Sequence, residues 1–380
     1  MKITVAIDSF KGSLPSLTSG EAVKEAAERV FDKPEVFVRP LADGGEGTVD
    51  AIISANGGEL ITLFVTGPLG KPVKASYGLV RKTNTAVIEM SSAAGITLLK
   101  REELNPLYTT TFGVGEIIRD AISKGARRFI IGIGGSATND GGVGMLKALG
   151  FEFFNSAGEL IENGAIGLKD LTGISCDKAL PELSECEFMV ACDVKNPLCG
   201  EFGASAVYGP QKGATPEMIK DMDAWLKNYA RLTKQKKPEA DEAYEGTGAA
   251  GGMGFALMSY LGARLTSGIE LIMRESALEE YIKKSDIVIT GEGRLDGQSA
   301  MGKAPVGVAR LAKKYSKLVI AFSGCVTEDA GRCNEEGIDA FFPILRAPVS
   351  LSEAMNVENA KKNLRDTAEQ AFRLIKALTK

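Results

Sequence analysis

Strand and helix signals alternate at both ends of this 380-residue chain, and this alternation constrains the fold more than any other feature. At each end, apolar runs of strand length are followed by polar loops and then by segments with helix signals. Alternation of this kind is typical of a parallel sheet with helices on both faces. The strands predicted in these two segments are residues 2–7, 35–39, 286–290, 318–323 and 340–344.

Capping residues mark where the predicted helices begin. Thr18 and Glu21 form a capping-box pattern that predicts the first helix, and Asp43 with Glu46 is predicted to cap the second. Another helix is expected directly after Lys303, and a long helix is expected at the end of the chain. Together with the strands, these helices predict a doubly wound domain.

The middle of the chain follows a different pattern. Three strand-like runs are separated by turn-rich stretches of hairpin length, which predicts an antiparallel meander. The same region adds a helix, a strong buried strand and a long amphipathic helix. The meander is expected at 60–66, 73–80 and 85–90, and the later elements at 111–124, 128–133 and 216–236.

The two patterns together predict two different α/β domains. A chain of this length exceeds the size at which a single core stops growing. We predict that both termini, residues 1–57 and 286–380, form the doubly wound domain, and that residues 58–285 form a mixed α/β domain inserted into it. The functional site is expected in the cleft that the two linkers cross.

The composition excludes several classes of function. The chain has no histidine, which rules out Ser-His-Asp and Cys-His catalytic pairs and HExxH zinc sites. The net charge is only -4 and no basic stripe is present, so a nucleic-acid partner is not expected. The apolar run at residues 3–7 is too short for a signal peptide or a membrane span, so no membrane partner is expected and the predicted location is the cytoplasm.

The loop after the first predicted strand has the sequence DSFKGS, at residues 8–13. Ligands of open α/β sheets bind beyond the carboxyl ends of the strands, so this loop is a candidate site. Asp8 could bind a metal, Lys11 could neutralise phosphate charge, and Ser9 and Ser13 could bind a polar substrate. An Asx turn with a surface lysine is the alternative interpretation.

A second loop, IGGSATNDGG at residues 133–142, directly follows the strand predicted at 128–133. Its glycine amides and its hydroxyl groups could form an anion-binding nest, and its amide and carboxylate could bind Mg²⁺ or orient a hydroxyl group. The alternative is a structural glycine turn that leads into a helix. The candidate residues of this loop are Gly134, Gly135, Ser136, Thr138, Asn139 and Asp140.

Two familiar nucleotide-binding patterns are nearly present. Residues 132–137 fit a GxGxxA dinucleotide fingerprint, but turn formers occupy the positions where its helix should begin. Residues 297–303 fit GxxxxGK, but Ala304 replaces the Ser or Thr that would bind Mg²⁺. Neither pattern is complete, although Lys303 beside a helix start can still contact a phosphate.

Several long motifs carry a resemblance to a known family. DSFKGS, PLADGGEGT, GGSATNDGG, NPLCGEFGAS, GPQKGA, GAAGGMG and GEGRLDGQS occur in this order over essentially the whole chain. This set resembles the motifs of the bacterial glycerate kinase family. The resemblance implies ATP-dependent and Mg²⁺-dependent phosphorylation of D-glycerate, usually to 2-phosphoglycerate. It also implies a flavodoxin-like domain that carries a second, differently folded α/β domain.

Candidate roles follow from this chemistry. Because histidine is absent, a carboxylate must receive or orient the proton of the acceptor hydroxyl, and Asp193 and Asp296 are both candidates since each is predicted just after a strand. Lys11 and Arg294 are candidates for contacts with the substrate carboxylate or the transferred phosphoryl group. The candidate metal ligands are Asp8, Asp140 and Glu292.

Two other functions compete with a kinase. A non-catalytic hydroxy-acid sensor would be stabilised by its ligand without turnover of ATP. A nicotinamide-dependent dehydrogenase would need a base, and the chain lacks histidine. The sequence leaves open the position of phosphorylation (C2 or C3, the latter giving 3-phosphoglycerate), the enantiomer, the domain that binds adenine and the oligomeric state, a homodimer included.

Overall fold

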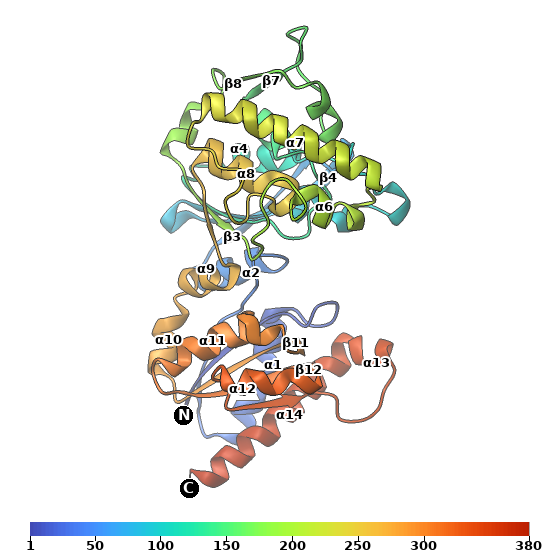
Figure 1. Ribbon diagram of the computed structural model, residues 1–380. Coiled ribbons are helices and arrows are strands. Elements are labelled where there is room, and N and C mark those ends of the chain that lie inside the picture. The colour runs from blue at the N-terminus through green and yellow to red at the C-terminus, as the bar shows by residue number, and fades with distance from the viewer. Residues whose placement is uncertain (380) are drawn as a thin grey trace. The chain divides into compact units, whose positions relative to one another are not determined.

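The computed structural model describes residues 1–379, whose contacts divide into two compact units (Figure 1). The first unit consists of Met1–Asp43, Asp50–Asn56 and the chain from Ile269 onward, and the second of Gly44–Val49 and Gly57–Gly268. The domain limits expected from the sequence stay a prediction. The units differ from them at Gly44–Val49, which belongs to the second unit, and after residue 268, where the helix that precedes β11 packs against α11 and β1 of the first unit.

The sheet of the first unit is parallel throughout, with the strand order β13-β12-β11-β1-β2. Numbered within this unit alone, the order is 2-1-3-4-5, which is the flavodoxin-like arrangement. The predicted α/β class and doubly wound sheet are therefore confirmed. The strands are β1 (Lys2–Ile7), β2 (Glu35–Val38), β11 (Ile287–Leu295), β12 (Leu318–Val326) and β13 (Ala340–Pro343).

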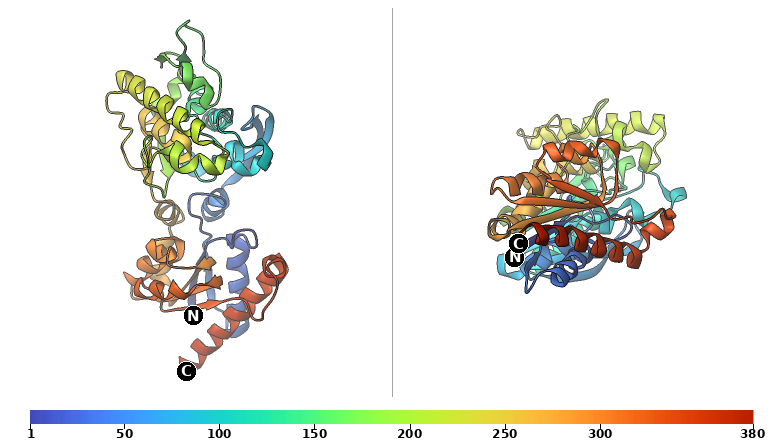
Figure 2. Two further views of the ribbon diagram at one scale, coloured as in Figure 1. Left: turned by 45° about the vertical axis from the view of Figure 1, so that its right-hand side comes forward. Right: turned by 90° about the horizontal axis from the view of Figure 1, so that it is seen from below.

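Helices cover both faces of this sheet because its strands are apolar on both sides. Ile3, Val5 and Ile7 share one hydrophobic cluster with α1 and α14, so alternate residues of β1 point to that face. Thr4 points to the other face, where its hydroxyl contacts that of Ser285 at the end of α10, 2.7 Å away. The right-hand view of Figure 2 shows the red α14 along one side of the orange-red strands. The helices are α1 (Ser16–Val30), α2 (Thr48–Asn56), α9 (Gly268–Glu275), α10 (Leu278–Lys284), α11 (Ala304–Lys313), α12 (Arg332–Glu335), α13 (Leu351–Met355) and α14 (Val357–Leu378).

Both predicted helix caps of the N-terminal segment are wrong. Helix α1 begins at Ser16, so Thr18 lies inside its first turn, and Pro15 stands at the cap position without a side-chain hydrogen bond. Helix α2 begins at Thr48, five residues after Asp43. The Asp43 carboxylate accepts a hydrogen bond from Lys11, a tertiary contact that the capping pattern did not predict.

The third strand of the alternation is longer than predicted. Strand β11 continues to Leu295, five residues past the expected end, because β12 continues beside it to Val326. Glu292 pairs with Ser323 and Arg294 with Cys325 in this extension. Glu292 and Arg294 therefore lie on a strand and not in the loop in which the sequence placed them.

The second unit contains a mixed sheet with the order β10-β9-β6-β5-β4-β3 and a small β7-β8 hairpin. Strands β3, β4 and β5 pair antiparallel, which confirms the predicted meander, and β5, β6, β9 and β10 are parallel. The strands are β3 (Glu59–Thr66), β4 (Pro72–Val80), β5 (Thr85–Glu89), β6 (Arg128–Gly132), β7 (Glu152–Phe154), β8 (Gly173–Ser175), β9 (Glu187–Ala191) and β10 (Arg264–Thr266). The helices are α3 (Ser91–Ala94), α4 (Phe112–Ser123), α5 (Val143–Ala148), α6 (Ala204–Tyr208), α7 (Pro216–Lys236) and α8 (Ala249–Leu261).

A left-handed turn at the start of α8 brings backbone close to the loop after β6. Ala250, Gly251 and Gly252 all have positive φ, and a Cβ on Gly251 would lie 2.0 Å from the Thr138 carbonyl oxygen. The Gly251 carbonyl accepts a hydrogen bond from the Gly141 amide at 2.9 Å. Only glycine fits at position 251, so the GAAGGMG motif serves a packing role here.

Helix α7 begins with a side-chain cap, which leads to a first prediction. The Thr215 hydroxyl accepts a hydrogen bond from the Met218 amide at 3.3 Å, and Pro216 occupies the first helical position. Thr215→Ala is expected to lower the free energy of unfolding by about 1 kcal/mol. Thr215→Ser keeps the acceptor oxygen and should melt within about 1 °C of the parent, roughly 2–4 °C above the alanine variant. Thermal melting followed by circular dichroism decides, and equal melting of the two variants would show that the cap contributes nothing.

No helix of residues 1–379 is both long enough and apolar enough to cross a membrane.

Candidate active site

Carboxylates gather at the carboxyl ends of β1 and β11 in the first unit. Asp8 directly follows β1, and its amide donates to the Gly291 carbonyl on the neighbouring β11. The residue is 6% exposed. Burial, followed by the charge of Asp43, raises the pKa of Asp8 to about 7, and Glu292 adds to this effect. We call Asp8, Asp43 and Glu292 the carboxylate cluster.

Lys11 lies beside the carboxylate cluster and supplies a positive charge to it. Its ammonium group lies 3.0 Å from a carboxylate oxygen of Asp43. Burial alone would lower the pKa of Lys11, but the carboxylates, Asp43 first, raise it above its usual value. Lys11 is largely exposed, so its charge is also available to a ligand in solvent.

The two serines of the DSFKGS loop flank Lys11 in the sequence. The Ser9 amide donates to an Asp8 carboxylate oxygen at 2.6 Å, which helps to hold that side chain in place. The Ser13 hydroxyl is buried and has no hydrogen-bond partner. An unpartnered buried hydroxyl is unusual in a folded protein and is consistent with a bound water or ligand.

Glu292 is held by the turn that follows β11. The Ser299 hydroxyl donates to Glu292 at 2.5 Å, and burial raises the pKa of Glu292. Asp296 accepts hydrogen bonds from the amides of Gln298 and Ser299, at 2.9 and 3.1 Å. Asp296 therefore has a local structural role in this turn, and its expected role as a base stays a prediction.

Two more cations lie on the same side of the first unit. Arg294 is exposed and its guanidinium lies 3.5 Å from Asp296. Lys303 is exposed and directly precedes α11, and Pro305 lies in the first turn of that helix. The charge of Lys303 lowers the pKa of Glu292 and so opposes the effect of burial. The first unit thus brings Asp8, Lys11, Arg294, Asp296 and Lys303 together around the carboxyl end of β11.

Asp193 belongs to the second unit. It lies two residues after the end of β9, is exposed, and accepts a hydrogen bond from the Gly268 amide at 2.9 Å. Gly268 is the residue at which the chain leaves the second unit. The two candidate bases, Asp193 and Asp296, thus belong to different units.

The loop of residues 133–142 follows β6 and lies against the segment after β5. The Ala137 amide donates to the Ala94 carbonyl, and the Ile96 amide donates to the Gly135 carbonyl, both at 2.9 Å. Gly134 and Gly135 are exposed, whereas Ser136 is 8% exposed and the residues beyond it are buried. The tip of this loop therefore exposes glycine backbone, and the next residue, Ser136, is nearly buried, an arrangement that suits an anion.

Asp140 fills the interior of this loop. Its carboxylate is 0% exposed and accepts hydrogen bonds from the Thr111 amide, the Thr111 hydroxyl and the amides of Gly142 and Gly144, at 2.8 to 3.2 Å. Burial raises the pKa of Asp140, while these donors oppose the shift. The carboxylate therefore joins α4, α5 and the loop, and its expected role as a metal ligand stays a prediction.

A buried lysine that the sequence did not single out lies behind the loop. Lys212 is 1% exposed, and its ammonium donates to the Ser136 hydroxyl at 2.9 Å and to the Thr138 carbonyl at 2.6 Å. Burial lowers the pKa of Lys212 to about 7, although the charge of Asp140 acts in the opposite direction. Within the GPQKG turn, a positive φ at Gly213 and the tight turn begun by Pro210 direct this side chain inward. From sequence alone, a lysine in such a turn would be interpreted as exposed.

Two further polar atoms of the loop are buried without a partner. These are the Thr138 hydroxyl oxygen and the Asn139 carboxamide oxygen. The Asn139 amide nitrogen is engaged, because it donates to the Ser205 hydroxyl at 2.8 Å. The inner side of the loop therefore has hydrogen-bonding capacity that the protein itself does not use.

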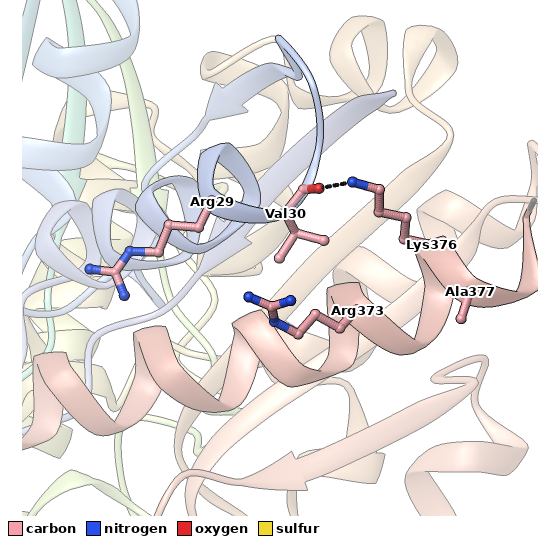
Figure 3. Close-up of a pocket in the computed structure, with 5 residues that line it drawn as sticks. All are labelled: Arg29, Val30, Arg373, Lys376 and Ala377. Atoms are coloured by element: carbon pink, nitrogen blue, oxygen red, sulfur yellow. Dashed lines mark hydrogen bonds between the residues drawn. The ribbon is translucent and has the colours of Figure 1, made fainter.

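A hollow of about 300 Å³ lies elsewhere in the first unit, between α1 and α14. Figure 3 shows Lys376 reaching the Val30 carbonyl at the end of α1. The other cations of the hollow, Arg29 and Arg373, both pair with Glu369. These contacts assign the charged side chains of the hollow to the interface between α1 and α14. The Lys376 ammonium also complements the partial negative charge at the carboxyl end of α1.

Comparisons with known proteins agree on one family. A model described as "Glycerate kinase family" matches residues 3–376. A glycerate kinase of Haemophilus influenzae is 46% identical over 99% of either chain, and a glycerate 2-kinase of Escherichia coli is 45% identical over 97% of this chain and 98% of its own. A crystal structure from Salmonella typhimurium LT2, assigned as a glycerate kinase 2, matches with a TM-score of 0.92 and 44% identity over 100% of this chain and 99% of its own.

Proposed function

Because this chain belongs to the glycerate kinase family, we propose that it transfers the γ-phosphoryl group of ATP to D-glycerate and forms 2-phosphoglycerate. Membership itself makes the chain an enzyme of this kind, with small-molecule substrates and a nucleotide among them. The identity of the nucleotide, the metal, the enantiomer and the product are the proposed part. We place the reaction in the cytoplasm.

The observation that carries the proposal is the carboxylate cluster with Lys11 at the carboxyl ends of β1 and β11. Phosphoryl transfer requires cations around the transferred group and carboxylates for a metal ion and an acceptor hydroxyl. We assign Lys11, Arg294 and Lys303 to the negative charge of the phosphoryl group and the glycerate carboxylate. Ser9 and Ser13 would contact the same ligands through their hydroxyl groups.

The first unit also fits a divalent cation. The Asp8 carboxylate is buried beside two other carboxylates, so a positive ion would relieve the unfavourable charge that raises its pKa. We propose that Asp8 and Glu292 hold Mg²⁺, which when bound would neutralise charge on the nucleotide phosphates. No group of three or more acidic or cysteine side chains in residues 1–379 is arranged to hold a metal by itself. Mg²⁺ usually binds one or two carboxylates and completes its shell with water and phosphate oxygens.

The glycine-rich loop of the second unit supplies the other anion site. We propose that the backbone of Gly134 and Gly135 and the hydroxyl groups of Ser136 and Thr138 bind an anionic part of a substrate, with Asn139 orienting a hydroxyl group. A carboxylate must accept or orient the hydroxyl proton of D-glycerate, and Asp193 and Asp296 remain the two candidates. Asp193 is the more exposed of the two and accepts a hydrogen bond from the Gly268 amide, and Asp296 accepts two hydrogen bonds within its own turn.

Turnover with defined substrates tests the proposal. ADP release should be measured with ATP, Mg²⁺ and D-glycerate, and the phosphate position of the product should be determined by phosphorus NMR. We expect D-glycerate-dependent turnover of roughly 1–100 per second and 2-phosphoglycerate as product. L-glycerate and reactions without Mg²⁺ serve as controls and should be much slower.

Other results of this assay would contradict specific parts of the proposal. A 3-phosphoglycerate product would overturn the position of transfer but not the reaction. Stabilisation by D-glycerate in thermal melting without any ADP release would overturn the reaction and favour a sensor. Light scattering of the same sample measures whether the protein is the homodimer that the sequence allows.

A further inference from the structure

The contacts of Lys212 determine where the hydroxyl proton of Ser136 can point. A charged lysine carries three N–H donors and no acceptor, so the Ser136 oxygen is the acceptor in their 2.9 Å hydrogen bond. The hydrogen of the Ser136 hydroxyl must then be directed to another group. Lys212 is 1% exposed and lies on the inner side, whereas Ser136 is 8% exposed and follows the exposed Gly134 and Gly135.

We propose that Lys212 is a positioning residue whose ammonium, by donating to Ser136, turns the Ser136 hydroxyl proton outward to donate to an anionic oxygen of a ligand at the glycine-rich loop. The inference rests on the proposed function, because the anionic oxygen would belong to the carboxylate of D-glycerate or to a nucleotide phosphate. The second contact of Lys212, to the Thr138 carbonyl, holds the ammonium on the loop backbone in the orientation that this requires. Lys212 itself does not touch the ligand.

Loss of the Lys212 proton would reverse the hydrogen bond. A neutral amine has a lone pair, so it can accept the Ser136 hydroxyl proton and turn it inward, away from the ligand. The pKa of Lys212, lowered to about 7 by burial, places this change near neutral pH. Asp140 is the charged group that opposes the shift, and Asp140 in turn interacts with Lys147 of α5 and Tyr229 of α7.

The sign of the pH dependence follows from linkage. An anion that binds better when Lys212 is charged raises the pKa of Lys212, so binding takes up protons at a pH above that pKa. Affinity should be highest below about pH 7 and should fall as the pH rises. The carboxylate of D-glycerate does not titrate in this range, so its own ionisation adds no slope.

Isothermal titration calorimetry without turnover tests this inference. D-glycerate and ADP are titrated separately at pH 6.5 and 8.5, in buffers with different ionisation enthalpies, to obtain affinity and proton uptake. For one of the two ligands, we expect about tenfold weaker binding at pH 8.5 and net proton uptake. The ligand that shows the effect identifies the source of the anionic oxygen.

Three variants separate positioning from structure. Lys212→Met removes the ammonium at similar length, and Ser136→Ala removes the hydroxyl while it leaves Lys212 in place. Both variants should bind the ligand weakly at pH 6.5. In both, the proton uptake on binding and the pH dependence of affinity should fall to the values that the ligand's own ionisation causes. Lys169→Met, at an exposed lysine of the same unit, should behave as the parent.

Several outcomes would overturn the inference. The inference is wrong if the parent protein binds with equal affinity at both pH values and takes up no protons beyond those that the ligand's own ionisation requires. It is also wrong if a folded Lys212→Met variant keeps the full pH dependence of affinity. If Lys212→Met fails to fold, Ser136→Ala decides alone, and retention of the slope in that variant contradicts the proposal. Turnover of D-glycerate with pH-independent binding overturns only this inference, whereas pH-linked binding without turnover overturns only the proposed reaction.

Discussion

Asp8→Asn is expected to lower turnover by roughly 10²–10³-fold and at the same time to raise the melting temperature at pH 8. The carboxylate of Asp8 is buried beside Asp43 and Glu292, so its charge is unfavourable in the folded protein and its pKa is raised to about 7. Asparagine has the same shape without the charge. Active-site residues often destabilise the folded protein, so their replacement can raise stability while it lowers activity.

The pH dependence of this effect has a definite sign. Because the pKa of Asp8 is higher in the folded than in the unfolded protein, the folded state loses stability as the pH rises from about 3.8 to about 7. The advantage of Asp8→Asn should therefore grow over this window and stay constant above pH 7. The full difference is at most about 4 kcal/mol, and a rise of roughly 5 °C in the melting temperature at pH 8 is expected.

Thermal melting without Mg²⁺, together with steady-state kinetics, measures both parts of this prediction. Asp32→Asn, at an exposed carboxylate after α1, is the matched control and should change neither quantity. Added Mg²⁺ should raise the melting temperature of the parent and of the control more than that of Asp8→Asn. An Asp8→Asn variant with normal turnover would remove Asp8 from the site, and a lower melting temperature would show that its charge is stabilising.

Asp140→Asn is expected to lower the stability of the folded protein strongly. One oxygen of the Asp140 carboxylate accepts three hydrogen bonds and the other accepts one from the Gly142 amide. Asparagine keeps only one acceptor oxygen, and an NH₂ group stands in place of the other. This NH₂ group must face a backbone N–H donor in a fully buried place. The expected loss is about 3 kcal/mol, which corresponds to a fall of roughly 6–12 °C in the melting temperature.

This second prediction also separates the structural role of Asp140 from the metal role that the sequence suggested. Asp170→Asn, at an exposed carboxylate of the same unit, is the control and should melt as the parent does. Thermal melting is followed by circular dichroism, and the dependence of turnover on Mg²⁺ concentration is measured for each variant. Parent-like melting of Asp140→Asn combined with a much weaker response to Mg²⁺ would contradict the structural role and support Asp140 as a metal ligand.

The elements that local patterns specify were predicted well. Strand β1 and helix α7 have the bounds expected from the sequence, because apolar runs and helical periodicity depend on neighbouring residues only. Predictions failed where a partner far along the chain decided the result. The end of β11 depends on β12, and Asp43 contacts Lys11 across 32 positions instead of capping α2.

The sequence by itself determined that this protein is an α/β enzyme of the glycerate kinase family, because strand periods, glycine-rich loops and ordered motifs are local properties of the chain. Only the tertiary structure decided the burial, the hydrogen-bond partners and the pKa values of the polar residues in those loops. Thr111 and Asp140 are 29 positions apart, and Ser136 and Lys212 are 76 apart, yet these contacts set which carboxylate is structural and which lysine is buried. Burial and charge act through space, so the raised pKa of Asp8 and the lowered pKa of Lys212 arise only when the chain has folded.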